Sequence, residues 1–286
     1  MRGELTQAAV EAQPEWLAQV PTDRRLPAGR VVAVGCGTSF HAAQTTGAGM
    51  DSLEFLLAPP GADVLVAVSH EGGTRLTLEA AQAVDGPTWL VTGKPGSDLA
   101  ALCDEVVYAT PEVEKSYCHT ASYTCAVAAL AALRGEDVSW LPDAVADVLA
   151  GERLPVSEHQ RFLVVGAGRD WPTAQEAALK LREGVHVAAE AYRLEELLHG
   201  HLAAIDERVR AFVLEGEGRA PARAAQAAAA LRELGCDTTL VPTRHPVVDV
   251  VPFQLLTLDL AEARGVDPDA LRRDDPRWQA ARDAYD

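Results

Sequence analysis

Short apolar runs alternate with longer amphipathic stretches along this 286-residue chain, and such an alternation is compatible with few fold classes. Continuous β-branched runs with helices between them are typical of a parallel sheet that is covered on both faces. The sequence therefore predicts an α/β fold. Seven runs fit its buried strands: 31–34, 64–68, 88–92, 105–108, 162–165, 209–214 and 238–241.

The pattern occurs twice. A Gly-x-Gly turn follows a strand-like run at Gly35 and again at Gly166, 131 residues later, which indicates two copies of one α/β unit. A chain of this length suits one double-size domain or two domains of about 140 residues. We place the first unit, with an N-terminal helical segment, at 1–150 and the second, with a C-terminal tail, at 151–286.

Charge and composition exclude several classes of protein. The 42 acidic and 25 basic residues give a net charge of −17, which argues against a nucleic-acid or anionic-membrane partner. It does not exclude an anionic small molecule held by N–H donors. The longest apolar stretch, 124–133, is too short to span a bilayer, and we expect no signal peptide. Five cysteines without a CxxC pair indicate a reduced, cytoplasmic chain.

The first candidate site is formed by the turns that contain Thr38-Ser39 and Ser69…Thr74. Ligands bind at the carboxyl ends of parallel strands, where helix N-termini offer N–H donors to anions. Alternatively, the hydroxyl residues only cap the helices. A nucleotide site is disfavoured, because Gly35-x-Gly37 lacks the third glycine and no P-loop lysine follows.

Two further candidates lie in the second half. Glu176, Lys180 and Glu183 are spaced to share one face of a helix, either as a functional cluster or as a solvated ion pair. The run 195–201 combines carboxylates with His199, which is a composition suited to proton transfer. No third ligand accompanies its His-x-His pair, so we expect no metal. We interpret His41, His159 and His245 as surface or capping histidines.

In this order, the motifs resemble the sugar isomerase (SIS) domain family over nearly the whole chain. The likeness is strongest to the isomerase half of glucosamine-6-phosphate synthase and to free-standing fructosamine-6-phosphate deglycases. It rests on the CGTS turn at 36–39, the loop Ser-His-Glu-Gly-Gly-Thr at 69–74, the segment EAALKLRE at 176–183, the segment 190–200 and Asp275-Pro276-Arg277.

The resemblance implies two pseudo-symmetric flavodoxin-like units and a homodimer whose active sites take residues from both chains. It implies a small-molecule sugar phosphate as substrate and no cofactor. The implied catalytic residues are Glu183, His199 and Lys180. The implied substrate-binding residues are Gly37, Thr38, Ser39, Ser69, His70, Glu71, Thr74, His119 and Glu176.

The chain departs from the family pattern at several positions. Glu71 replaces a small hydroxyl residue of the phosphate loop, and a carboxylate there repels a phosphate unless it is paired. His119 and Ala121 replace a serine and a lysine. Ala281 stands where the synthase has the lysine implied to form a Schiff base, and the neighbouring Arg282 cannot replace it. The glutaminase half of the synthase has no counterpart in this sequence.

These features favour an SIS enzyme that acts as a deglycase or deaminase on the 6-phosphate of an amino sugar or fructosamine. Such a substrate carries its own nitrogen and needs no lysine imine. Glu183 would move a proton between C1 and C2, and water would then release the amine. The alternatives are an aldose–ketose isomerase that releases no amine, a non-catalytic sugar-phosphate sensor, and a binder of some other ligand.

Overall fold

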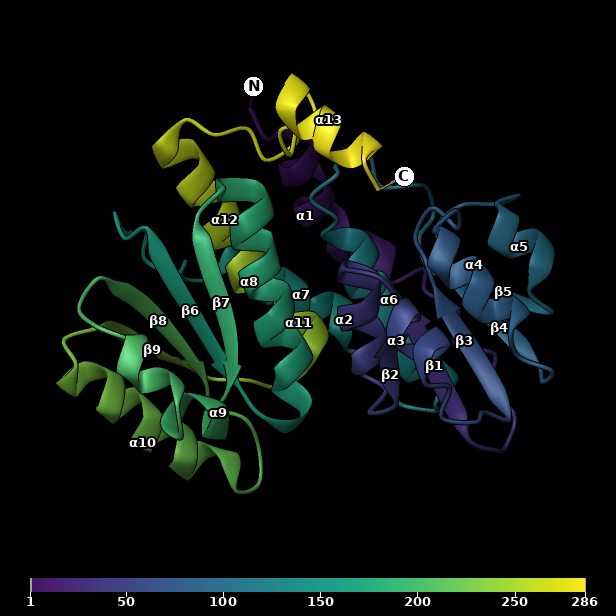
Figure 1. Cartoon of the computed structure of the whole chain (residues 1–286), viewed down its shortest axis with the longest axis horizontal. Coiled ribbons are helices and arrows are strands. Elements are labelled where there is room, and N and C mark those ends of the chain that lie inside the picture. The colour runs from purple at the N-terminus through teal and green to yellow at the C-terminus, as the bar shows by residue number, and fades with distance from the viewer. Residues whose placement is uncertain (1, 286) are drawn as a thin grey trace.

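Two parallel sheets form the framework of the chain, which the computed structural model describes over residues 2–285 (Figure 1). The first sheet has the order β2-β1-β3-β4-β5 and the second the order β7-β6-β8-β9. All neighbouring strands are parallel. The first order is that of flavodoxin-like folds, and the second repeats its first four positions. The predicted fold class is therefore confirmed.

The strands of the first sheet are β1 (Val31–Gly35), β2 (Gly49–Asp51), β3 (Val64–Val68), β4 (Thr88–Thr92) and β5 (Glu105–Tyr108). Those of the second are β6 (Arg161–Gly166), β7 (Ala188–Arg193), β8 (Val209–Leu214) and β9 (Asp237–Val241). All seven expected strands are present. The sequence missed β2 and β7, which are edge strands at the same position in the two sheets.

Helices cover the sheets and fill the space between them (Figure 1). In the first half they are α1 (Glu4–Leu17), α2 (Thr38–Gln44), α3 (Ser52–Leu57), α4 (Arg75–Gln82), α5 (Asp98–Leu102), α6 (Ala121–Leu133) and α7 (Leu141–Ala150). In the second half they are α8 (Trp171–Val185), α9 (Leu194–Leu198), α10 (Ala220–Glu233), α11 (Pro246–Asp249), α12 (Val251–Arg264) and α13 (Pro276–Asp283). No helix within residues 2–285 has the length and apolarity to cross a membrane.

The helix α6 lies at the centre of the molecule, and every one of its residues is buried. A helix that is apolar on all sides needs packing partners on all sides. Here α1, α2 and α11 supply them, and α12 in turn contacts α1, α7 and α8. These contacts join the two halves, so the division into 1–150 and 151–286 stays a proposal.

Buried amides fix the start of α6. The Gln13 amide donates to Gln254 Oε1 at 2.9 Å, and the Thr124 hydroxyl donates to Gln13 Oε1 at 2.8 Å. The Gln254 amide donates to the Thr120 carbonyl at 3.2 Å. Because buried polar groups are costly unless they are paired, this network ties α1, α6 and α12 into one arrangement. It thereby positions the residues at the start of α6, which face the candidate site.

Candidate active site

The turn between β1 and α2 forms the first wall of the site. Gly37 has φ of 55°, a left-handed conformation that favours glycine. Thr38 follows at the first position of α2, but its hydroxyl does not cap the helix. It donates to Glu176 Oε1 at 3.2 Å and accepts from Lys180 Nζ at 3.3 Å. This turn therefore connects the first sheet with α8, where the predicted catalytic residues lie.

The loop between β3 and α4 forms the second wall. Ser69 is buried at the end of β3, and its Oγ lies 3.2 Å from Thr74 Oγ1 and accepts from the Gly72 N–H at 3.2 Å. Thr74 makes no side-chain cap bond to α4. Glu71 is exposed in the same loop and lines the cavity. Two hydroxyls and a carboxylate thus face the same space.

Two histidines close the side of the cavity. His70 Nε2 accepts from the Glu114 N–H at 2.8 Å, so a neutral His70 carries its proton on Nδ1. Burial, reinforced by the neighbouring His119, lowers the pKa of His70 to about 4. The two rings lie edge to face with centroids 5.4 Å apart. Burial also lowers the pKa of His119, so both rings are neutral near pH 7 and add no positive charge to the cavity.

A buried carboxylate holds the segment that carries His119. Glu114 accepts from the Thr120 N–H at 2.7 Å, the Thr120 hydroxyl at 2.9 Å and the Ser122 N–H at 2.7 Å. These donors belong to the first turn of α6, where backbone N–H groups lack partners in the helix itself. Glu114 therefore acts as the cap of α6 and positions the histidine wall.

Three charged residues of α8, Glu176, Lys180 and Glu183, lie along one face, as their spacing predicted. Lys180 Nζ is 2.6 Å from Glu183 Oε2 and 3.4 Å from Glu176 Oε1. The side chains of Glu176 and Lys180 are 0% and 1% exposed, so the alternative of a solvated surface pair is wrong. Burial opposes both charges, but Lys180 and His41 lower the pKa of Glu176, and the carboxylates raise that of Lys180. The ammonium and the Glu176 carboxylate are therefore both charged at neutral pH.

Two residues of this region, His41 and Tyr123, were not among the predicted site residues. His41 is not a surface histidine: it is 8% exposed, and its Nδ1 lies 2.7 Å from Glu176 Oε2. Tyr123 lines the cavity, and its hydroxyl is buried without a hydrogen-bond partner among the described residues. The only signal available for His41 was its position one helical turn after Thr38.

These walls enclose a cavity of about 220 Å³. Glu176 and Lys180 lie beneath it, and Gly37 lies in the adjoining turn without lining it. Eight of the predicted site residues do line it: Thr38, Ser39, Ser69, His70, Glu71, Thr74, His119 and Glu183.

His199 lies apart from this cavity. Its side chain is 72% exposed at the end of α9, where Nε2 is 3.0 Å from Glu195 Oε2. It does not line the cavity of its own chain. Among residues 2–285, no cluster of His, Cys, Asp and Glu side chains could hold a metal ion.

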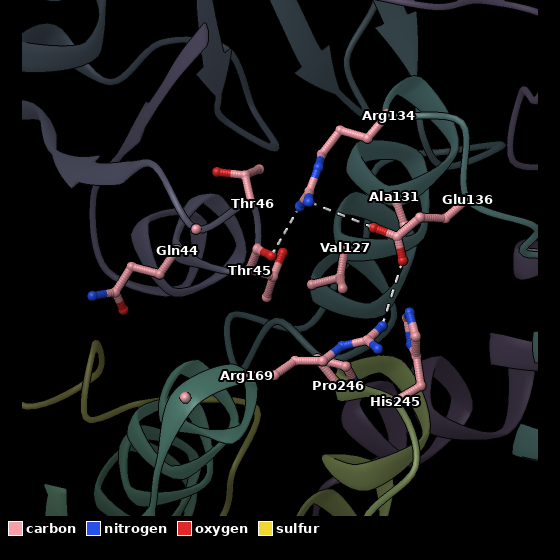
Figure 2. A pocket seen from close by; sticks show the side chains of 12 residues that line it. Gln44, Thr45, Thr46, Val127, Ala131, Arg134, Glu136, Arg169, His245 and Pro246 are labelled. Carbon is pink, nitrogen blue, oxygen red and sulfur yellow. Dashed lines mark hydrogen bonds and ion pairs between the residues drawn. The ribbon is translucent and has the colours of Figure 1, made fainter. Parts of the chain in front are cut away.

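A larger hollow, about 350 Å³, lies at the other end of α2 and α6 (Figure 2). Its two arginines are both paired with Glu136, at 3.8 Å from Arg134 Nη2 and 3.5 Å from Arg169 Nη2. His245 in its wall accepts from the Val247 N–H at 3.2 Å and caps α11, as we expected of it. None of the predicted catalytic residues reaches this hollow, so we place the site in the smaller cavity.

Known proteins with similar sequences agree with the family resemblance described above. No family model matches the chain. The chain is 28% identical over 85% of its length to glutamine–fructose-6-phosphate aminotransferase (isomerizing) of Gloeobacter violaceus, and 29% identical over 85% to that of Thermus thermophilus. It spans about half the length of these relatives, 50% and 51%.

Solved structures show the same fold. The C-terminal domain of glucosamine-fructose-6-phosphate aminotransferase from Francisella tularensis has a TM-score of 0.77 at 19% identity and covers 93% of this chain and 98% of its own. Glucosamine-6-phosphate deaminase from Thermotoga maritima has a TM-score of 0.77 at 20% identity, with coverages of 93% and 97%. Tagatose-6-phosphate ketose/aldose isomerase from Escherichia coli has a TM-score of 0.76 at 15% identity, with coverages of 94% and 95%. The comparisons confirm the resemblance to the SIS domain family.

Proposed function

We propose that this SIS-type chain catalyses proton transfer between C1 and C2 of an amino sugar or fructosamine, followed by hydrolysis of the resulting imine. The observation that carries the proposal is the position of Glu183. Its carboxylate lines the cavity, while the buried ammonium of Lys180 holds it at 2.6 Å. A carboxylate fixed beside a sugar-sized cavity is suited to taking a proton from carbon and returning it to the next carbon.

The reaction balances without a cofactor. In a fructosamine, Glu183 takes a proton from C1 while the C2 oxygen takes a proton from a general acid, which gives an enol. Glu183 returns its proton to C2 and the nitrogen gives up a proton to the general acid's conjugate base, which leaves a C1=N imine, and water then releases an aldose and the amine. For a 2-amino aldose the proton moves from C2 to C1, and hydrolysis gives a ketose and ammonia. In both cases the substrate supplies the nitrogen.

The strand-end turns are the proposed binding site for the sugar portion. Ser39, Ser69 and Thr74 offer hydroxyls beside the first turns of α2 and α4. The relatives and neighbours are named for phosphorylated sugars, which supports a sugar phosphate as the general substrate class.

A second copy of the chain would complete the site. The reaction needs a group that moves protons on oxygen and nitrogen, and a histidine is suited to this. His199 is exposed and outside the cavity of its own chain, so we propose that it reaches the site of a partner in a homodimer.

A plain aldose–ketose isomerase is the second candidate, because Glu183 alone suffices to move a proton between C1 and C2. It is supported by the structural likeness to a tagatose-6-phosphate ketose/aldose isomerase. Only the release of free amine separates the two functions.

The test uses purified protein with fructosamines, glucosamine 6-phosphate and fructose 6-phosphate, following amine release and ketose–aldose conversion together. We expect amine release from an amine-bearing substrate. Glu183→Gln should reduce turnover by about 100-fold or more, the usual contribution of a general base. The exposed Glu233→Gln serves as the matched control. Full turnover by the Glu183 variant would refute the mechanism, and conversion without amine release would favour the isomerase.

A further inference from the structure

A second hollow, of about 410 Å³, shares Glu183 with the cavity but none of its other lining residues. It lies between the end of α8 and the segment 271–282, which includes most of α13. A ligand whose reacting carbons lie at Glu183 therefore has space on two sides of this carboxylate. One side is the hydroxyl-lined cavity, and the other is this hollow.

The lining of the hollow is strongly basic. Arg182, Arg272 and Arg282 all line it, although the whole chain carries a net charge of −17. None of the three forms a salt bridge within the part of the chain that the structure describes. Glu183, the carboxylate among the lining residues, is already engaged by Lys180. The two arginines of the hollow in Figure 2 differ, since Glu136 pairs with both of them.

Local structure fixes two of these arginines. The guanidinium of Arg272 lies 4.3 Å from the centre of the Trp278 ring, and Arg272 has φ of 54°. Arg282 Nη2 donates to the Leu271 carbonyl at 2.9 Å. Its Nη1 is buried and has no partner among the described residues, and the same holds for His186 Nε2 in the same hollow. Buried polar nitrogens without partners are rare, and both of these belong to residues that line the hollow.

The cavity itself offers no comparable place for a negative charge. Glu71 adds a carboxylate to the loop 69–74 that carries Ser69 and Thr74, and His70 and His119 are neutral. A guanidinium group binds carboxylate or phosphate through two parallel N–H···O bonds, so the arginine hollow is the better site for an anion.

We propose that the hollow formed by Arg182, Arg272 and Arg282 binds an anionic group of the substrate, a carboxylate or a phosphate, while C1 and C2 lie at Glu183. The inference rests on the proposed function, because it takes Glu183 as the reacting centre. The anion has two possible sources with the same chemistry: a carboxylate on the amine portion or a phosphate on the sugar portion.

Four compounds separate these sources: N-fructosylglycine, N-fructosylethanolamine and the 6-phosphates of both. We measure KM and kcat for amine release with the wild-type chain, Arg272→Gln and Arg282→Gln. Dissociation constants come from calorimetry in a Glu183→Gln background, where the substrate is not consumed. Arg273→Gln is the matched control, because Arg273 is adjacent and stacks on Tyr117 without lining the hollow.

We expect both variants to raise KM and the dissociation constant roughly tenfold or more for compounds with the recognised anion, with little change in kcat. N-fructosylethanolamine, which has neither anion, should bind equally to all forms. An effect that follows the glycine carboxylate assigns the anion to the amine portion, and one that follows the phosphate assigns it to the sugar.

Equal effects on all four compounds, no effect, or no binding to the parent protein would overturn the proposal. Amine release that is insensitive to the arginines would leave the proposed function standing and refute only the anion hollow. Binding that depends on the arginines without amine release would support the hollow and refute the deglycase function.

Discussion

Replacement of Lys180 by methionine tests the electrostatics of the site directly. The lysine is fully buried, and Nζ contacts Glu183 at 2.6 Å and Glu176 at 3.4 Å. Methionine preserves most of the packing volume and removes the charge. Glu176 then keeps only the His41 ring and the Thr38 hydroxyl as hydrogen-bond partners. The variant thus leaves a carboxylate buried with part of its compensation lost.

The expected cost is that of breaking a buried ion pair, about 3–5 kcal/mol of unfolding free energy. For a chain of this size that corresponds to a melting temperature lower by on the order of 10 °C. The exposed Lys94→Met, which removes a charge without such contacts, should change stability by less than about 0.5 kcal/mol.

The loss of unfolding free energy caused by Lys180→Met should increase with pH. In the parent chain the pKa of Glu176 lies below its ordinary value of 4.5. The ionised Glu176 therefore stabilises the fold above that pH, and this contribution to the unfolding free energy is lost on acidification. Without Lys180, burial raises the pKa of Glu176, and its ionisation then costs stability at neutral pH. The difference in unfolding free energy should therefore be larger at pH 8 than at pH 5.

Urea unfolding at both pH values measures this difference, and Lys180→Met/Glu176→Gln completes the cycle. The double variant should recover part of the loss, because no unpaired carboxylate remains. A loss below about 1 kcal/mol at pH 8, or one that is the same at pH 5, would refute this account of the buried charges.

Two further predictions concern the loop 69–74 and the proposed homodimer. An added Cβ at Gly72 (φ 64°) would lie 2.0 Å from Ser97 Oγ, whereas one at Gly61 (φ 66°) meets nothing within 4 Å. Gly61→Ala should lower the free energy of unfolding by about 1 kcal/mol, and Gly72→Ala should lower it clearly more. Urea unfolding measures both values, and equal losses would contradict the packing argument. If His199 completes a partner's site, mixing the inactive variants Glu183→Gln and His199→Gln should restore roughly a quarter of the parent activity, because half of randomly formed dimers hold one intact site. Successive purification through a different affinity tag on each variant verifies the mixed dimer, and no recovery of activity in it would contradict a shared site.

The central strands were predictable because each is a continuous apolar run buried on both faces. Of the four edge strands, β5 and β9 were also predicted, but β2 and β7 were not. β2 has only three residues, and β7 mixes exposed and half-buried positions, so neither carries the strand signal.

The sequence predicted the parts of the candidate site that lie within one helix or loop, but not the contacts between helices. Helical spacing placed Glu176, Lys180 and Glu183 on one face, but it could not show that Glu176 and Lys180 are buried. His41 lies 135 positions from its partner Glu176, and only the packing of α2 against α8 brings them together. The resemblance named both Glu183 and His199 as catalytic residues of a site shared between chains, and the fold separates the two within one chain.

The residues near the end of the chain connect the proposed reaction with the proposed anion site. A lysine at position 281 could form an imine with a ketose, whereas Ala281 cannot, and the guanidinium of Arg282 is not nucleophilic at neutral pH. The reaction proposed here needs no such imine because the substrate carries its nitrogen at C1 or C2. A basic residue beside Glu183 then has no covalent role to perform. Arg282 lines the hollow with one buried, unpartnered Nη1, which is a geometry suited to holding an anion rather than forming a bond. The loss of the lysine and the basic lining of the hollow therefore point to the same kind of substrate: one that brings its own amine and an anionic group.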